Sequence, residues 1–391
     1  MTCTRNCPVC GSENWEPFLG FRTGRALTSD QAIICADLDK SVCRGCGIVA
    51  NTRRATEAEL RRYYSTDYTL GLSETEHLFF GSHGPLPRSQ VYFDWISPHL
   101  PEHFSSLLEI GCGQGHLLKR LSDRYPGKRL RGIDGSREAC GIARKKGLAV
   151  DPGMLSPDDG APPRPKVDVI LAVGVLEHVE TPAFFVHSIS QMLSENGTAI
   201  LCAPVQDYPG CDLFFCEHIW HFTAFQCAGM LENNGLEVVH LDFHHPVNTG
   251  FGLFVCRSAM GKKHPVNPAP QSRAAITNRD VWLRIFDAVN AWLAARTGIR
   301  LAVFGCSEIF SLLMAYTALG DHNILACLDE NRALWGTGKH GIEVVSPEWL
   351  AAGRADAVLL AISPKYHNLV LEKIRPYGIE VFSFIQKEIG A

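Results

Sequence analysis

Short apolar runs alternate with amphipathic stretches along most of the chain. The run 106–110 is followed by a helical pattern over 116–125, in which the leucines fall on one face. A second strand is predicted over 129–134 and ends in a carboxylate. This order of strand, helix and strand is typical of a doubly wound α/β sheet, which binds its ligand at the carboxyl ends of its strands.

The turn after the first of these strands carries regularly spaced glycines. Gly111, Gly113 and Gly115 give the pattern G-x-G-x-G, preceded by Glu109, whereas a dinucleotide-binding turn needs G-x-G-x-x-G. Glycine lets the backbone lie against a ligand that offers no phosphate. Asp134, 23 residues after Gly111, is placed to accept hydrogen bonds from both hydroxyls of a ribose. A dehydrogenase or an unrelated nucleotide-binding protein is the alternative, and the glycine spacing disfavours it.

The pattern E-x-G-x-G-x-G with a late aspartate resembles the class I methyltransferases that use S-adenosylmethionine (SAM). The resemblance covers about 89–257, and four further segments look like the family's later strands: 167–179, 196–202, 235–239 and 252–257. It implies a Rossmann-like methyltransferase core and SAM as the cofactor. It also implies a set of cofactor-binding residues: Glu109, Gly111, Gly113, Gly115, Asp134 and, against the adenine, Met154 or Leu155.

The segment before this core is predicted to be a short helix over 56–68 that carries several tyrosines. Thr56 and the glutamate three residues later are typical of a helix N-terminus. The tyrosines can pack this segment against the core. Alternatively, one of them reaches the methyl donor, and Tyr68 is our candidate for this contact.

Methyl transfer to an O–H or C–H acceptor requires a base as well as alignment. Glu217 and His218 are the first candidates, because the class I resemblance places an E-H-x-x-x-F segment facing the acceptor. The adjacent glutamate can fix the tautomer of His218 and keep it basic near neutral pH. His178 lies beside the donor methyl by its position in the family, and His221 is a weaker candidate. A structural role for the Glu-His segment stays open, and no residue grouping indicates a catalytic metal.

Two C-x-x-C pairs lie near the start of the chain. Cys7 and Cys10 form the first pair, Cys43 and Cys46 form the second, and a glycine follows each pair. Four thiolates complete a tetrahedral zinc site and leave no open position for catalysis. The loop of 32 residues between the pairs costs about 3 kcal/mol to close, whereas structural zinc contributes roughly 10–16 kcal/mol. We therefore predict a structural zinc ion.

The composition of the chain limits the kinds of binding partner that we expect for this protein. The 391 residues carry a net charge of −4, which does not favour a nucleic acid or an anionic membrane as the partner. No apolar run reaches the roughly 18 residues of a membrane span, and the first residues lack an apolar signal core. The fifteen cysteines are an odd number scattered through apolar segments, which favours reduced thiols. We expect a cytoplasmic protein that is a monomer or a homodimer.

The last part of the chain repeats the strand-helix-strand pattern around a turn with a single glycine, Gly305. This pattern predicts a second, smaller Rossmann-like domain that serves docking or dimerisation, or binds part of the acceptor. The expected domains are a zinc-binding module (1–55), a helical lid or linker (56–88), the SAM-binding core (89–260), a linker with a helix (261–298) and the C-terminal Rossmann-like domain (299–391).

The order of zinc module, methyltransferase core and Rossmann-like domain resembles the NDP-sugar C-methyltransferases of deoxysugar pathways. This resemblance implies a 4-keto sugar nucleotide as the acceptor, deprotonated by a histidine, with the C-terminal domain helping to hold the nucleotide. Two alternatives remain open. One is an O- or N-methyltransferase of a natural product on the same scaffold, and the other is a non-catalytic module that binds SAM or zinc.

Overall fold

A computed structural model describes residues 5–67, 76, 78–81, 84–157, 165–259 and 273–384. The chain forms two compact units. The first consists of Met1–Phe18, Asp39–Asp212 and Glu217–Ala275, and the second consists of Leu19–Leu38, Leu213–Cys216 and Ile276–Ala391. The segment 19–38 therefore belongs to the same unit as the C-terminal part, although the sequence pattern placed it in the module 1–55.

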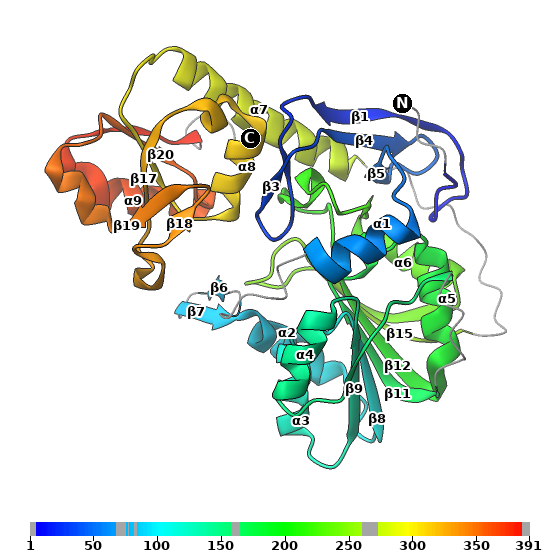
Figure 1. Cartoon of the computed structure of the whole chain (residues 1–391). Helices are drawn as coiled ribbons and strands as arrows, with labels where there is room; N and C mark the ends of the chain where they lie inside the picture. The colour runs from blue at the N-terminus through cyan, green and yellow to red at the C-terminus, as the bar shows by residue number, and fades with distance from the viewer. Residues whose placement is uncertain are drawn as a thin grey trace. The chain divides into compact units, whose positions relative to one another are not determined.

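The first unit is built on a seven-stranded sheet with the order β10-β9-β8-β11-β12-β15-β14 (Figure 1). The strands are β8 (Ser106–Ile110), β9 (Arg129–Asp134), β10 (Val150–Pro152), β11 (Val167–Val173), β12 (Leu193–Pro204), β14 (Leu236–Asp242) and β15 (Phe251–Ser258). The strands from β10 to β12 are parallel, and β15 is antiparallel to both of its neighbours. This topology confirms the predicted class I Rossmann-like core. The strand order reverses between β8 and β11, where such sheets bind ligands.

Helices cover both faces of this sheet. On one face α2 (Arg88–Ile96), α3 (His116–Arg124) and α4 (Arg137–Lys145) share a buried apolar cluster with the strands. On the other face α5 (Pro182–Met192) and α6 (Ala224–Asn233) belong to a second cluster. The leucines of α3 are buried, as the helical period predicted.

A second, four-stranded sheet has the order β1-β4-β5-β13. Its strands are β1 (Trp15–Phe21), β4 (Leu38–Cys43), β5 (Val49–Asn51) and β13 (Trp220–His221). The chain returns after β12 to supply β13, which pairs antiparallel with β5 through Trp220–Ala50 and His221–Val49. Helix α1 (Glu57–Arg62) follows and begins at Thr56, which forms a capping box with Glu59, as predicted.

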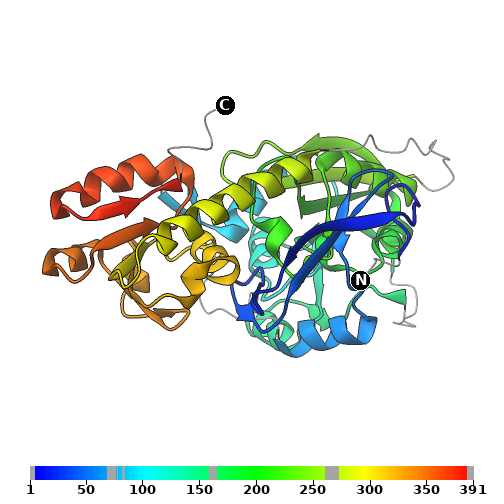
Figure 2. The same ribbon diagram turned by 90° about the horizontal axis from the view of Figure 1, so that it is seen from above.

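The second unit contains a six-stranded sheet with the order β18-β19-β17-β16-β20-β21. Its strands are β16 (Leu301–Phe304), β17 (Ile324–Leu328), β18 (Gly338–Lys339), β19 (Ile342–Val345), β20 (Ala357–Leu360) and β21 (Glu380–Phe382). All of the pairings are parallel except that of β18. The helices are α7 (Ala274–Ala294; the long yellow helix of Figure 2), α8 (Glu308–Tyr316) and α9 (His367–Ile374). The predicted second Rossmann-like sheet is therefore present.

Aromatic packing explains why an N-terminal segment belongs to this second unit. The ring of Phe21 lies 4.6 Å from that of Tyr316 and 5.8 Å from that of Phe286, measured between centroids. The Tyr316 hydroxyl donates to the carbonyl of Phe214 at 2.6 Å and accepts from the N–H of Leu27 at 3.0 Å. The pair β2 (Ala26–Leu27) and β3 (Ile33–Ile34) forms in the same segment.

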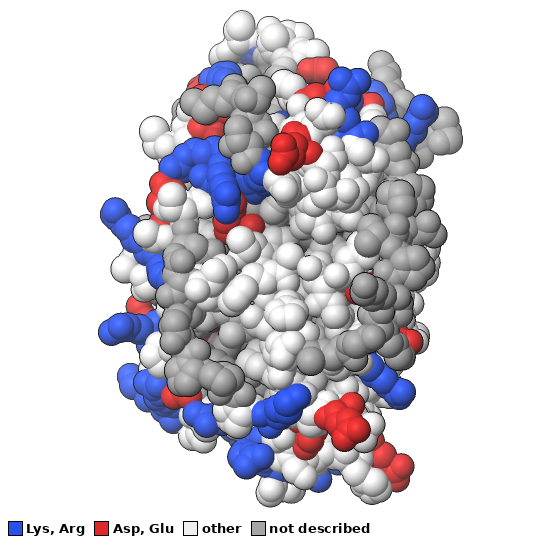
Figure 3. Space-filling model, turned by 90° about the vertical axis from the view of Figure 1, so that its right-hand side faces the viewer, with Lys and Arg blue, Asp and Glu red and all other residues white. Residues whose placement is uncertain are grey.

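A short hairpin pairs β6 (Leu78–Gly81) with β7 (Gly84–Pro87), directly before α2. On the face shown in Figure 3, basic and acidic side chains both occur around a broad uncharged area. Among the described residues, no helix is both long and apolar enough to cross a membrane.

Candidate functional site

The glycine turn after β8 combines close packing with one open position. Gly111, Gly113 and Gly115 all have positive φ, at 70°, 51° and 73°, which L side chains rarely adopt. A Cβ at Gly111 would lie 2.4 Å from a Val175 methyl carbon, and one at Gly115 would lie 2.4 Å from a Leu148 methyl carbon. A Cβ at Gly113 would meet no described atom within 4 Å. The outer glycines therefore pack the turn, and the central one leaves space above it.

Asp134 ends β9 beside this turn. Its Oδ2 accepts from the N–H of Gly113 at 2.7 Å, and its Oδ1 accepts from the N–H of Ser136 at 2.8 Å. Burial raises the pKa of Asp134, although these two hydrogen bonds oppose the shift. Each carboxylate oxygen has a further lone pair and can accept a hydroxyl hydrogen. The geometry is compatible with the predicted contact to a ribose.

Glu109, in β8, is a buried carboxyl group with a side chain only 4% exposed. Among the described residues, its Oε2 has no hydrogen-bond partner. Burial and the charge of Asp134 raise the pKa of Glu109 to about 8, and Arg88 opposes this shift. A cation that arrived next to Glu109 would restore its charged form.

The residues predicted to contact the adenine follow β10, the strand that pairs with β9. Met154 and Leu155 are half-buried and follow β10. A Cβ at Gly135 would lie 3.4 Å from Met154 Cγ and 3.3 Å from Tyr64 Cβ, so these two side chains border the turn after Asp134. Tyr68, the tyrosine selected from the sequence, lies outside the described residues.

A cluster of titratable side chains follows β12. Asp212 bonds both histidines of the 217–221 segment: its Oδ1 pairs with Nδ1 of His218, and its Oδ2 lies 2.7 Å from Nδ1 of His221. Gln206 donates to the same Oδ2 at 2.5 Å. The ring of His178 meets that of His218 edge to face, with centroids 4.5 Å apart. Two predicted candidates, His178 and His218, are thus neighbours.

Burial and the carboxylate set the pKa values in this cluster. Burial alone would lower the pKa of His218, but Asp212 and then Glu217 outweigh it, and the pKa is raised. Burial and the neighbouring His218 hold the pKa of His178 well below its usual range. With Nδ1–H donating to Asp212, the neutral form of His218 keeps its lone pair on Nε2. His218 can therefore accept a proton, whereas His178 stays neutral.

The partner that fixes the His218 ring differs from the one we expected. The sequence suggested Glu217, but the Nδ1 contact is made by Asp212, from a 3-10 turn (Asp212–Phe214). Glu217 acts on His218 through its charge, which contributes to the raised pKa of the imidazole. No motif marks Asp212, and only its separation of six residues from His218 hinted at the contact.

Glu177 is a further residue that sequence reasoning missed. Ligand atoms of Glu177, His178 and His218 lie within 4.8 Å of one another. Burial raises the pKa of Glu177 to about 7, and His218 opposes this shift. Two histidines and a carboxylate at such separations are also a ligand set known for divalent metals, which the sequence did not indicate.

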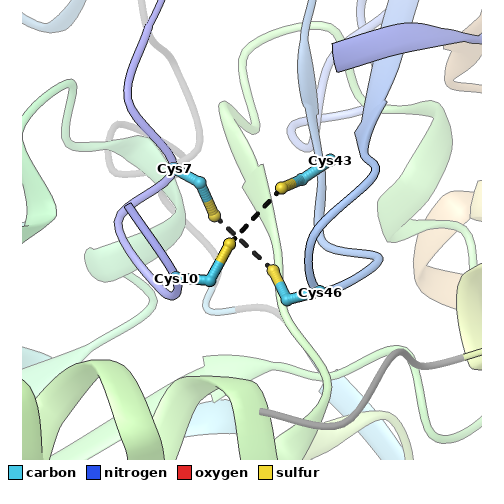
Figure 4. A group of neighbouring side chains, drawn as sticks. All are labelled: Cys7, Cys10, Cys43 and Cys46. Atoms are coloured by element: carbon cyan, nitrogen blue, oxygen red, sulfur yellow. Dashed lines mark hydrogen bonds between the residues drawn. The ribbon is translucent and has the colours of Figure 1, made fainter. Parts of the chain in front are cut away.

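The four predicted cysteines meet at one point (Figure 4). Their sulfur atoms all lie within 4.8 Å of one another, with Cys7–Cys46 at 3.5 Å and Cys10–Cys43 at 3.6 Å. Tetrahedral zinc with Zn–S bonds of about 2.3 Å would hold its sulfurs about 3.8 Å apart. A Cβ at Gly45 would lie 2.8 Å from Sγ of Cys10, which explains the glycine there. The donor set fits zinc.

Lys40 connects the four-stranded sheet with the histidine segment. This lysine of β4 is only 1% exposed, and its Nζ donates to Asn51 Oδ1 at 2.6 Å and to the carbonyl of His218 at 3.0 Å. Because Lys40 holds the backbone of His218 and Asp212 holds its ring, the orientation of the imidazole is constrained.

The part of the chain that contains the glycine turn and the histidine cluster is similar to known proteins. Residues 87–241 match a family model described as "Methyltransferase domain". A ubiquinone biosynthesis O-methyltransferase of Azoarcus sp. is 36% identical over 109 residues, which are 27% of this chain and 46% of that protein. A trans-aconitate 2-methyltransferase of Mycobacterium tuberculosis is 28% identical over 103 residues, which are 26% and 37% of the two chains. The chain thus spans about half the length, or less, of these curated relatives.

Similar folds occur among solved structures. A SAM-dependent methyltransferase from Thermotoga maritima is 19% identical, with a TM-score of 0.36 over 44% of this chain and 88% of that chain. Mitomycin 7-O-methyltransferase is also 19% identical, with a TM-score of 0.37 over 44% and 54%. Residues 87–241 thus match a methyltransferase-domain family model, and the sheet that they contribute to has the class I Rossmann-like α/β fold.

Proposed function

We propose that this protein transfers a methyl group from SAM to a small-molecule acceptor, with His218 as the general base. The observation that carries the proposal is the buried pair of Asp212 and His218, which leaves one imidazole nitrogen able to take a proton. When bound, SAM supplies the methyl group and its leaving group for an in-line displacement. The protein then has to align the acceptor and remove its proton.

The residues of the glycine turn would hold the cofactor. Gly113 leaves room for the ligand, and Asp134 accepts from the ribose hydroxyls. Met154 or Leu155 would contact the adenine, and Tyr68 remains a candidate for contact with the methyl donor. The matched family model spans residues 87–241, which include Gly113, Asp134, Met154 and Leu155, and supports SAM as the ligand.

The histidines have different roles in the proposed reaction. His218 takes the acceptor proton on Nε2, and Asp212 stabilises the resulting imidazolium, as carboxylates do in other His-Asp pairs. Glu217 adds to the negative field at His218. His178 is held neutral by burial and can donate or accept one hydrogen bond with the acceptor.

For the acceptor we propose a keto-deoxysugar nucleotide, methylated on carbon after His218 removes a C–H proton. The support is the resemblance in domain order together with a buried base. O-methylation of a natural product is the second candidate, because several relatives are named ubiquinone biosynthesis O-methyltransferases. A hydroxyl acceptor also needs a base, so the histidine pair serves both candidates.

Calorimetry with dTDP, in the presence of S-adenosylhomocysteine (SAH), separates these acceptors. Micromolar binding of dTDP would support the sugar nucleotide. Absence of binding would favour the natural-product acceptor. The intact chain should be used, because residues 19–38 belong to the same compact unit as the C-terminal part and truncation would expose their apolar partners.

Substitution of His218 tests the base directly. His218→Ala should abolish turnover while the affinity for SAH stays nearly unchanged, because the base contacts the acceptor and not the cofactor. His187→Ala, at an exposed position of α5, is the matched control and should behave as the wild type. Equal loss of turnover and SAH affinity in His218→Ala would mean that the residue is structural, and unchanged turnover would contradict the proposal.

We further propose that Cys7, Cys10, Cys43 and Cys46 bind a structural zinc ion. Elemental analysis of the purified protein should then find one zinc per chain. Cys43→Ser should lose the metal and unfold at a lower temperature, because zinc binding and folding are coupled. Cys35→Ser, at an exposed free cysteine, is the control and should keep the metal. A zinc-free wild type, or a Cys43→Ser variant with normal zinc content, would refute this role.

A further inference from the structure

Two cysteines of the second unit meet where β16 ends. Cys306 follows Gly305, whose N–H donates to the carbonyl of Leu328 at 2.8 Å. The N–H of Cys306 itself donates to Asp329 Oδ2, also at 2.8 Å. Cys327 lies in the neighbouring strand β17, directly before Leu328, and a hydrogen bond joins its thiol to that of Cys306. The turn after β16 is therefore tied to β17 both by its backbone and by sulfur.

The first unit shows the same turn beside a strand that offers no second thiol. Cys112 follows a glycine whose N–H donates to the next strand at 2.8 Å, so it takes the place that Cys306 has in the second sheet. The position that corresponds to Cys327 is Gly132, where a Cβ would lie 2.6 Å from Sγ of Cys112. The sulfur in this turn thus reaches back over the neighbouring strand. In the second unit it meets another cysteine there.

The two thiols differ in their exposure and in their ease of ionisation. Cys306 is half-buried, whereas Cys327 is fully buried. The hydrogen bond from Cys327 lowers the pKa of Cys306, burial opposes this shift, and the charge of Lys339 adds to it. The same hydrogen bond, and then burial, raise the pKa of Cys327. Cys306 also precedes Ser307, the N-cap of α8, and a helix N-terminus favours a thiolate. Cys306 is therefore the accessible thiolate, and Cys327 is its protonated partner.

Lys339 supplies a cation beside this pair. It ends β18, which is joined to β17 through β19 (Figure 1), and its side chain interacts electrostatically with both cysteines. Its Nζ donates to Gln31 Oε1 at 2.7 Å. Gln31 and His340, the residue after the lysine, both have positive φ, at 65° and 52°, a conformation that costs energy outside glycine. Surrounding contacts within the second unit therefore hold Lys339 close to the thiols.

Two adjacent thiols, the more exposed of them beside a cation, are the arrangement of a cysteine pair that is oxidised reversibly. We propose that Cys306 reacts with a hydroperoxide and that Cys327 then closes a disulfide with it. This chemistry is independent of methyl transfer, because no residue of the candidate methyltransferase site takes part in it.

The atoms and electrons of this oxidation balance. The Cys306 thiolate attacks one oxygen of the hydroperoxide, so that an S–O bond forms and the O–O bond breaks, and the departing oxyanion takes a proton from solvent. Cys306 is then a sulfenic acid. The sulfur of Cys327 attacks that of Cys306, so that the S–S bond forms and the S–O bond breaks, and the hydroxide leaves as water with the Cys327 proton. The hydroperoxide accepts the electron pair that the two thiols lose, and an added dithiol reverses the reaction.

Mass spectrometry of tryptic peptides follows this pair directly, because trypsin releases the segment 301–332, which contains Cys306 and Cys327 and no other cysteine. The reduced full-length protein is treated briefly with hydrogen peroxide, and its remaining thiols are blocked with N-ethylmaleimide in denaturant. The peptide 301–332 should carry no maleimide until dithiothreitol is added, and should then be labelled at both cysteines. The exposed Cys35, in the peptide 26–40, is the internal control and should be oxidised at least about tenfold more slowly. A peptide 301–332 that stays fully labelled at peroxide doses that oxidise Cys35 would overturn the proposal.

Single substitutions separate the roles of the two sulfur atoms. Cys327→Ala should stop the reaction at the sulfenic acid, which dimedone traps on Cys306. Cys306→Ser should leave Cys327 reduced and fully labelled by the maleimide. Absence of a dimedone adduct in the first variant, or oxidation of Cys327 in the second, would overturn the assigned roles. The wild-type measurement needs neither variant, so it stands even where a variant fails to fold.

Removal of the nearby cation tests what makes Cys306 reactive. Lys339→Met should slow the oxidation of Cys306 by about 3- to 10-fold, because the thiolate loses a neighbouring positive charge, and Lys339→Arg should keep most of the rate. Lys145→Met, at an exposed position of α4, is the matched control and should react as the wild type does. An unchanged rate in Lys339→Met would overturn the role of the lysine.

Discussion

The two Rossmann-like sheets of this protein end a central strand in the same way. In the first unit Asp134 accepts from the N–H groups of Gly113 and Ser136, at 2.7 and 2.8 Å. In the second unit Asp329 accepts from the N–H groups of Cys306 and Asn331, both at 2.8 Å. In each sheet the aspartate thus links the first turn to the chain that follows its own strand.

The turns themselves differ. The first has three glycines with positive φ, and a Cβ at the central one would meet nothing within 4 Å. The second has one, Gly305, where a Cβ would lie 2.3 Å from a methyl carbon of Ile362 and 2.7 Å from the carbonyl oxygen of Ala361. Gly305 is therefore required for packing, whereas no described atom crowds the Cβ position of Gly113 and only its positive φ favours glycine there.

This comparison teaches that a strand-end aspartate does not by itself identify a cofactor site. The same pair of backbone hydrogen bonds stabilises a turn in both sheets, with or without space for a ligand above it. What distinguishes the first turn is the open position at Gly113 together with the buried Glu109. Three experiments test this distinction.

The largest effect is expected from adding the same side chain to both turns. Gly113→Val should weaken SAH binding by more than about 100-fold, since the side chain would fill the ligand space, and should cost only about 1–2 kcal/mol of stability from the positive φ. Gly305→Val should leave SAH binding unchanged but lower the free energy of unfolding by about 3 kcal/mol or more, through overlap with Ala361 and Ile362. Calorimetry and denaturant unfolding of both variants measure this contrast, and the reverse pattern would refute it.

A smaller contrast is expected at the two aspartates. Asp134→Ala should weaken SAH binding by about tenfold or more, because hydrogen bonds to the ribose are lost. Asp329→Ala should lower the free energy of unfolding by about 1–3 kcal/mol and leave the SAH affinity unchanged. Unchanged SAH binding in Asp134→Ala would place the ribose elsewhere and make both aspartates purely structural.

The smallest expected effect is a change in the protonation of Glu109 when SAH binds. The pKa of Glu109 is raised to about 8, above the ordinary value of 4.5, so near pH 7 the folded protein without ligand holds a proton that the unfolded chain has lost. Its contribution to stability is therefore present at low pH and is lost as the pH rises towards 8.

An ammonium group bound at Glu109 would lower that pKa, so SAH binding near pH 7 should release up to about one proton, and the affinity should rise with pH up to about 8. Calorimetry in buffers of different ionisation enthalpy measures this release. Glu109→Gln should abolish it, and proton release that persists in that variant would come from another group.

The amino-acid sequence by itself indicated the strand-helix-strand unit of the first sheet, the glycine turn with Asp134, the capped helix at Thr56 and the two C-x-x-C pairs. These features depend on residues close in the chain, where period and spacing carry the information. The tertiary structure alone decided that Asp212 holds His218, that Arg88 and Glu177 both lie near Gly174, and that residues 19–38 pack into the second unit. Such contacts form where strand ends and loops that are distant in the sequence come together. The type of a residue, apolar or charged, does not specify which of these distant residues it will contact.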